Sequence, residues 1–279
     1  MRYLISFFDW ILYTSLLTAT CATGLCMATE KLMVQRNGEV GQILPISRLH
    51  VLIFGGTLLI YNTPRLVPKP YGKIRKSRKH FEWYLLFFTI GLISVIYCSY
   101  SLPATVLKLL SVLAAISFAY YLPLLPFEHK RRLRDFGWLK IFVLTIIWTM
   151  VTCILPIIYY NNTPLNYPFE ISERLLFIFT LCIVFDIRDI KTDIGNNIRT
   201  LPGRIGLSNS YILINSALLL FTIICFFQYF QIYNTGRLVA GLITALLSRM
   251  VIGYLKNHPT DRAYNTLADG VMLIYALLV

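Results

Sequence analysis

Long apolar runs, separated by short polar stretches, make up most of this chain. A helix needs about 20 mostly apolar residues to cross a lipid bilayer. Runs of that length recur along the whole sequence, so we expect an all-α, polytopic membrane protein. The predicted transmembrane helices are nine in number, at roughly 8–29, 44–63, 82–101, 103–122, 138–160, 171–190, 209–232, 237–256 and 264–279.

The first run is predicted to be a retained helix rather than a removed signal peptide. Asp9 interrupts its apolar region, and no clean small-x-small cleavage site follows it. In the second predicted helix, Gly55 and Gly56 are adjacent, which favours close packing against a neighbouring helix.

Composition agrees with a membrane protein of one domain. Hydrophobic residues make up 57% of the 279 residues and charged residues 14%, whereas soluble domains average about 25% charged residues. No polar stretch is long enough to form a soluble domain, so residues 1–279 are predicted to be a single transmembrane domain. The six cysteines lie in apolar segments and show no Cys-x-x-Cys spacing with a histidine partner, so the sequence favours neither a zinc finger nor a disulfide framework.

The net charge of +13 indicates an orientation in the membrane. Most of the 26 Lys and Arg residues fall in the loops after the second, fourth, sixth and eighth predicted helices. The positive-inside rule places these loops in the cytoplasm. We attribute the basic excess to topology and to anionic lipid rather than to nucleic acid. The expected location is the cytoplasmic membrane of a bacterium, with the polar motifs facing the cytoplasm.

Three carboxylates end the sixth apolar run. Asp186, Asp189 and Asp193 are spaced i, i+3 and i+7, so on a helix they fall within a sector of about 60°. Like charges on one face repel, which predicts a cation beside them, and Mg²⁺ prefers such oxygen ligands. Arg188 is expected on another face, where it would not neutralise the carboxylates. The alternative is a charged helix end at the membrane surface, satisfied by ion pairs and lipid head groups.

This segment resembles the second aspartate-rich motif of the UbiA superfamily of intramembrane prenyltransferases. The resemblance comprises Asp186-x-x-Asp189-x-x-x-Asp193, then Arg199-Thr200-Leu201-Pro202, then Arg204-x-Gly206. Further similarity runs through Ala119-Tyr120-Tyr121-Leu-Pro123, the basic loop up to Lys140, and the next helix with Trp148 and Leu155-Pro156. One small departure is Asn197, where the family has glycine.

The resemblance implies a central cavity enclosed by the nine helices. Two acidic motifs would face each other across it and hold Mg²⁺ on a prenyl diphosphate. Asp186, Asp189 and Asp193 would then be metal ligands. Arg199 would contact phosphate, and Lys140 is a further candidate for substrate binding.

The first motif departs from the family pattern of Asn-Asp-x-x-Asp-x-x-x-Asp. Asn62 matches, but Thr63, Leu66 and Pro70 occupy the aspartate positions. Pro64, Pro68 and Pro70 predict that no regular helix continues through this stretch.

Arg65 and Lys69 lie where the missing carboxylates would be, so they are candidates to contact the diphosphate directly. The alternative for the basic run that follows is a loop held to anionic lipid. The leading hypothesis is a Mg²⁺-dependent transferase of isoprenoid chains to a small aromatic or quinone-precursor acceptor. A non-catalytic protein that binds isoprenoids is the second hypothesis, and a transporter is a distant third.

Overall fold

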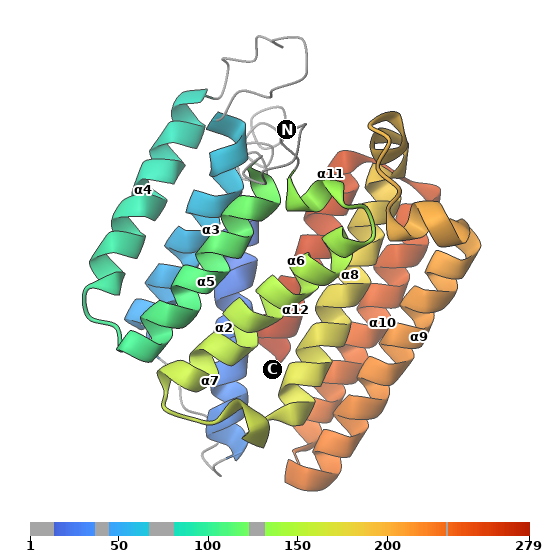
Figure 1. The fold of residues 1–279 in the computed structure, drawn as a ribbon. Helices are drawn as coiled ribbons and strands as arrows, with labels where there is room; N and C mark the ends of the chain where they lie inside the picture. Colours follow the sequence, from blue (N-terminus) through green and yellow to red (C-terminus); the bar gives the residue numbers. More distant parts are fainter. Residues whose placement is uncertain (1–13, 37–44, 67–80, 123–131, 233) are drawn as a thin grey trace, which may run out of the picture.

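A computed structural model describes residues 14–36, 45–66, 81–122, 132–232 and 234–279. All regular secondary structure in these ranges is helical (Figure 1). The helices are α2 (Leu16–Arg36), α3 (Arg48–Leu66), α4 (Phe81–Ser99), α5 (Ala104–Tyr121), α6 (Leu139–Thr149), α7 (Leu155–Tyr159), α8 (Pro168–Gly195), α9 (Leu201–Ile232), α10 (Thr235–Asn257), α11 (Asp261–Ala263) and α12 (Asp269–Leu278).

Short helical turns complete the chain path. Two are 3₁₀ turns, η2 (Leu133–Asp135) and η4 (Pro164–Asn166). Two are π-helical and join α-helices without a break: η3 (Met150–Ile154) links α6 to α7, and η5 (Tyr264–Ala268) links α11 to α12. Each of the nine predicted apolar segments therefore has a helical counterpart within the described ranges.

Five of the described helical stretches are long and apolar enough to cross a membrane. They are Phe81–Ser99, Ala104–Tyr121, Leu139–Tyr159, Leu201–Gln231 and Thr235–Asn257. Their outward surfaces carry large apolar side chains that a soluble protein would bury, as Ile96 and Leu246 illustrate. The protein is therefore an integral membrane protein, and the count of nine crossings remains a prediction.

The bundle has two groups of helices around a central layer. Figure 1 shows α3, α4 and α5 on one side, α8, α9 and α10 on the other, and α2, α6 and α12 between them. The central helices connect the two groups, since α2 packs against α3 and α12 while α6 packs against α8. Aromatic rings fill the core between α8, α9 and α12, where Phe177, Phe221 and Tyr275 contact one another.

The prediction of close packing at the glycine pair is confirmed for Gly55. Helices α3 and α4 approach so closely that a Cβ on Gly91 would lie 2.5 Å from the carbonyl oxygen of Gly55. A Cβ on Gly55 would lie 2.5 Å from the Cβ of Ser94. Small residues permit this approach of two backbones, as is common between membrane helices.

The proline prediction is wrong at Pro64, which lies inside α3. The helix continues to Leu66 because Pro64 is in the last turn, where its missing N–H removes one hydrogen bond and little helix remains to be disturbed. Pro68, Pro70 and Lys69 lie outside the described residues.

Candidate functional site

The three predicted carboxylates converge on one lysine ammonium group. Lys140 Nζ lies 2.8 Å from Asp186 Oδ1, 3.2 Å from Asp193 Oδ2 and 3.7 Å from Asp189 Oδ2. Asp186, Asp193 and Lys140 are buried, whereas the Asp189 side chain is 34% exposed. The prediction of a cation beside the carboxylates is confirmed, and the cation is a side chain of this chain.

The local structure explains how this geometry arises. Helix α8 continues past its predicted end to Gly195, which keeps all three carboxylates on one helical face. Lys140 is the second residue of α6, which packs against α8. Because charges withdrawn from water need close partners, a buried lysine among three carboxylates is held firmly in place.

Gly137 fixes the entry of α6. Its φ of +57° is in the left-handed region, and any Cβ there would overlap the carbonyl oxygen of Arg199. The segment before α6 is thereby held against the segment after α8. Asn197 has a φ of +58°, a conformation that asparagine tolerates better than most residues, which accounts for asparagine at the family's glycine position.

A second ion pair orders the same loop before α6. The Arg132 guanidinium binds Asp135 through two nitrogens, with Nη2 2.9 Å from Oδ1 and Nε 3.1 Å from Oδ2. Burial raises the pKa of Asp135, but the hydrogen bonds and charge of Arg132 outweigh it, so the pKa lies below its usual value.

The prediction that Arg188 would not neutralise the carboxylates is wrong for Asp189. The two side chains are adjacent in sequence, and Arg188 Nε lies 2.7 Å from Asp189 Oδ1. Arg188 also donates from Nη1 to Asn265 Oδ1 at 2.7 Å. A long guanidinium stem can reach around the helix surface, so helical angle alone does not exclude such a pair.

A polar cavity of about 330 Å³ adjoins this cluster. Arg65 from α3 lines it together with Asp186 and Asp189 from α8. Arg65, which lies where the first aspartate-rich motif is missing, therefore faces the same cavity as Asp186 and Asp189 of the second motif. Arg134 and Asp269 line the cavity as well.

The remaining predicted residues lie elsewhere. The Asn62 amide is buried and donates to the carbonyl oxygens of Thr14 and Leu58. Arg199 is exposed, and neither it nor Asn62 is among the residues that line the cavity. Asp193 contacts the ammonium of Lys140 but does not line the cavity.

Sequence reasoning did not single out Arg134 or Asp269. The Asp269 carboxylate accepts a hydrogen bond from Thr18 Oγ1 at 3.1 Å. Within the described residues, no Lys, Arg or His nitrogen lies within 4.0 Å of Asp269. An aspartate inside an apolar run was the signal that could have identified it, because such residues usually mark function.

An apolar pocket of about 170 Å³ lies next to the polar cavity. Tyr61 and Trp148 line both spaces. Trp148 Nε1 donates to the Tyr61 hydroxyl at 3.0 Å, and the Tyr121 ring lies 5.7 Å from the Tyr61 ring. These aromatic side chains therefore stand at the boundary between a charged space and an apolar one.

Comparison with known proteins assigns the fold. No family model and no curated protein matches the sequence. Among solved structures, a UbiA homologue from Aeropyrum pernix K1 has a TM-score of 0.63 at 14% identity, covering 93% of this chain and 96% of that chain. A digeranylgeranylglyceryl phosphate synthase has a TM-score of 0.57 at 14% identity, covering 100% of this chain and 98% of that chain.

The protein therefore shares its fold with these two solved structures. One of them is a UbiA homologue, which confirms the sequence resemblance at the level of the fold.

Proposed function

We propose that this protein is an intramembrane transferase that binds a prenyl diphosphate and moves its isoprenoid chain to a small aromatic or quinone-precursor acceptor. One observation carries the proposal: Arg65, Asp186 and Asp189 line a single polar cavity. The neighbouring apolar pocket offers a place for the chain of such a substrate. The digeranylgeranylglyceryl phosphate synthase of the same fold is named for a reaction product that carries isoprenoid chains.

Two arginines are available to bind the diphosphate. Lys140 and Arg188 already have carboxylate partners, whereas no carboxylate in the described part of the chain lies within 4.0 Å of Arg65 or Arg134. Guanidinium groups bind phosphate oxygens through paired hydrogen bonds. We assign Arg65 and Arg134 to the diphosphate, and Lys69 remains a candidate outside the described residues.

The acidic residues fit a Mg²⁺ ion beside the diphosphate. Asp186 Oδ2 is buried and has no hydrogen-bond partner, while Asp189 faces the cavity. Mg²⁺ typically takes one or two carboxylates and completes its shell with water and substrate phosphate. We propose Asp186 and Asp189 as its ligands, with Asp193 holding Lys140, and the bound ion would neutralise charge on the departing diphosphate.

The chain's own residues can perform the rest of the transfer. The carbon–oxygen bond to diphosphate breaks, and the bond from that carbon to the acceptor forms. Arg65 and Arg134 stabilise the negative charge on the leaving group. The aromatic faces of Tyr61 and Trp148 stabilise positive charge on the allylic carbon. Asp269, which has no basic partner within the described residues, takes the proton that the acceptor loses.

Equilibrium binding tests the first half of this proposal. Purified protein in detergent should bind farnesyl and geranylgeranyl diphosphate, and removal of Mg²⁺ with a chelator should weaken that binding. Two control ligands each lack one half of the substrate. Inorganic pyrophosphate lacks the isoprenoid chain, and the free prenyl alcohols lack the diphosphate. Binding that is absent, or the same with and without Mg²⁺, would contradict the proposed site.

A non-catalytic role is the second candidate function. The absence of all three aspartates from the first motif favours it, because the usual arrangement would place metal ligands there. Such a protein would bind the same diphosphates without releasing pyrophosphate.

A further inference from the structure

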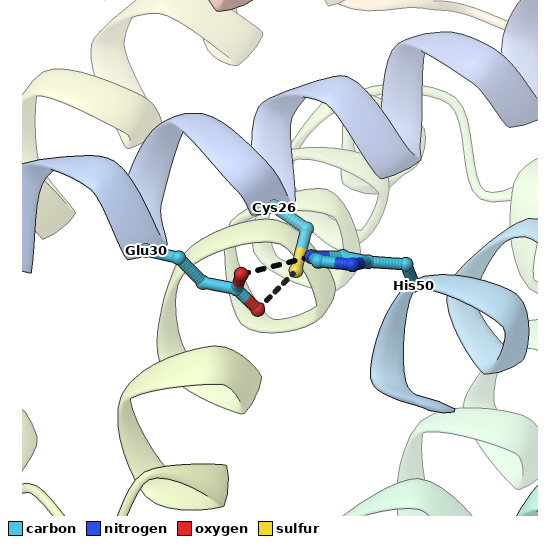
Figure 2. Close-up of side chains that lie close together, drawn as sticks. All are labelled: Cys26, Glu30 and His50. Carbon is cyan, nitrogen blue, oxygen red and sulfur yellow. Dashed lines mark hydrogen bonds and ion pairs between the residues drawn. The ribbon is translucent and has the colours of Figure 1, made fainter. Parts of the chain in front are cut away.

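A second cluster of buried polar side chains lies far from the polar cavity. It consists of Cys26 and Glu30 on α2 and His50 near the start of α3 (Figure 2). Thr18, which lines the polar cavity, and Glu30 are separated by about 18 Å along α2 at 1.5 Å per residue. The cluster therefore stands near the opposite end of the bundle and belongs to neither the polar nor the apolar pocket.

The three side chains point at one another, as Figure 2 shows. His50 Nε2 lies 2.9 Å from Glu30 Oε2, and Cys26 Sγ lies 3.8 Å from Glu30 Oε1. One thiol sulfur, one carboxylate oxygen and one imidazole nitrogen all lie within 4.8 Å of one another. Cys26 and Glu30 are four residues apart, which places them on one face of α2, and His50 reaches this face from α3.

We propose that Cys26, Glu30 and His50 bind a divalent transition-metal cation of the zinc type. A thiolate, a carboxylate and a neutral imidazole together carry two negative charges. These two charges would offset the two charges of a divalent ion, which lowers the cost of holding the ion away from water. Thiolate and imidazole ligands select Zn²⁺ and similar ions over Mg²⁺ and Ca²⁺, which prefer oxygen ligands.

Ser47 orients the ring of His50. Ser47 contacts the ring nitrogen that faces away from Glu30: its backbone N–H donates to His50 Nδ1 at 2.9 Å, and its hydroxyl oxygen lies 3.2 Å from the same atom. With Nδ1 accepting from this N–H, the ring proton is on Nε2. On metal binding at Nε2 that proton moves to Nδ1, where the Ser47 hydroxyl oxygen would accept a hydrogen bond in place of the one that the backbone N–H now donates. Such partners orient metal-ligating histidines in proteins.

Arg174 on α8 packs against the same part of α2. Arg174 Nη1 donates to the carbonyl oxygen of Leu25, the residue before Cys26, and its Nη2 donates to Thr29 Oγ1 at 3.3 Å. Three protein ligands leave one position of a tetrahedral zinc site for water.

Cobalt titration of the full-length protein in detergent tests this site. After treatment with a chelator, the protein should bind one equivalent of Co²⁺ and develop the near-ultraviolet band of a thiolate–cobalt bond. Zn²⁺ should displace the Co²⁺ and bleach the band. Cys26→Ala should lose the band and weaken binding at least about 100-fold, since loss of an outer partner alone costs 10–100-fold.

Cys26→Ser, which keeps the size of the side chain, guards against a folding defect in Cys26→Ala. It should also lose the band, with an unfolding temperature close to that of the original chain. Cys225→Ala is the matched control, because this cysteine is also buried but lies on α9, and it should retain the band. Absence of a thiolate–cobalt band in the unchanged protein, or its retention in Cys26→Ser, would overturn the proposal and leave Glu30 and His50 as a closed ion pair.

Discussion

Replacing Arg65 by alanine should weaken the binding of geranylgeranyl diphosphate by about 10- to 100-fold. Arg65 faces the polar cavity and has no carboxylate partner among the described residues, so its charge is available to the diphosphate. Hydrogen bonds to charged groups contribute about 1.5–3 kcal/mol, which corresponds to this range of affinity. Equilibrium binding of the diphosphate to purified protein measures the change directly.

Arg48→Ala is the matched control for this variant. Arg48 begins α3 and is exposed at the end of the helix opposite Arg65, so its removal should leave diphosphate affinity unchanged. Equal affinities of Arg65→Ala and the unchanged protein would mean that Arg65 serves lipid contact rather than the substrate.

Replacing Lys140 by methionine should destabilise the protein by about 3–5 kcal/mol. Methionine preserves most of the side-chain volume but removes the charge that balances Asp186, Asp189 and Asp193. Removal of one partner from a buried ionic cluster leaves charges that neither water nor protein compensates. Chemical or thermal unfolding in detergent, followed by circular dichroism, measures the loss.

Two comparisons make the Lys140 result specific. Lys108→Met changes an exposed lysine on α5 and should have a small effect. Lys140→Met combined with Asp186→Asn should regain part of the lost stability, because one of the uncompensated charges is gone. A Lys140→Met protein as stable as Lys108→Met would show that the ammonium does not hold the acidic cluster together.

The helices and the acidic face could be predicted because both depend on local sequence. An apolar run of membrane length forms a helix wherever it stands, and the spacing of Asp186, Asp189 and Asp193 fixes one helical face. The absence of aspartates from the first motif could also be recognised from the sequence alone. Thr63 at one of its aspartate positions is buried and donates its hydroxyl hydrogen to the Leu59 carbonyl oxygen.

The partners of these residues could not be predicted, because tertiary packing brings them together. Lys140 was identified as a substrate contact from the resemblance, yet its ammonium lies among the carboxylates of a helix far along the chain. Asp269 reaches the cavity from the last described helix. His50 meets Cys26 and Glu30 only because α2 and α3 pack side by side. Neither periodicity nor spacing encodes such contacts.

The structure changes the expected symmetry of the site. The resemblance implies two acidic walls with metal between them, but here the wall formed by α3 presents Arg65 to the cavity. The opposite wall retains its aspartates and carries Lys140 among them. On the α3 wall, Arg65 thus lies where the resemblance implies carboxylates that hold metal. A fixed cation can stabilise leaving-group charge as a metal does, so this substitution is compatible with turnover.

Pyrophosphate release tests the central claim of prenyl transfer most directly. Purified protein would be incubated with Mg²⁺, geranylgeranyl diphosphate and a panel of phenolic and quinone-precursor acceptors. We predict release that depends on an acceptor and disappears in Asp189→Asn, while the exposed control Asp261→Asn retains it. Diphosphate binding without release across the whole panel would contradict the transferase assignment and identify a protein that binds isoprenoids without reacting them.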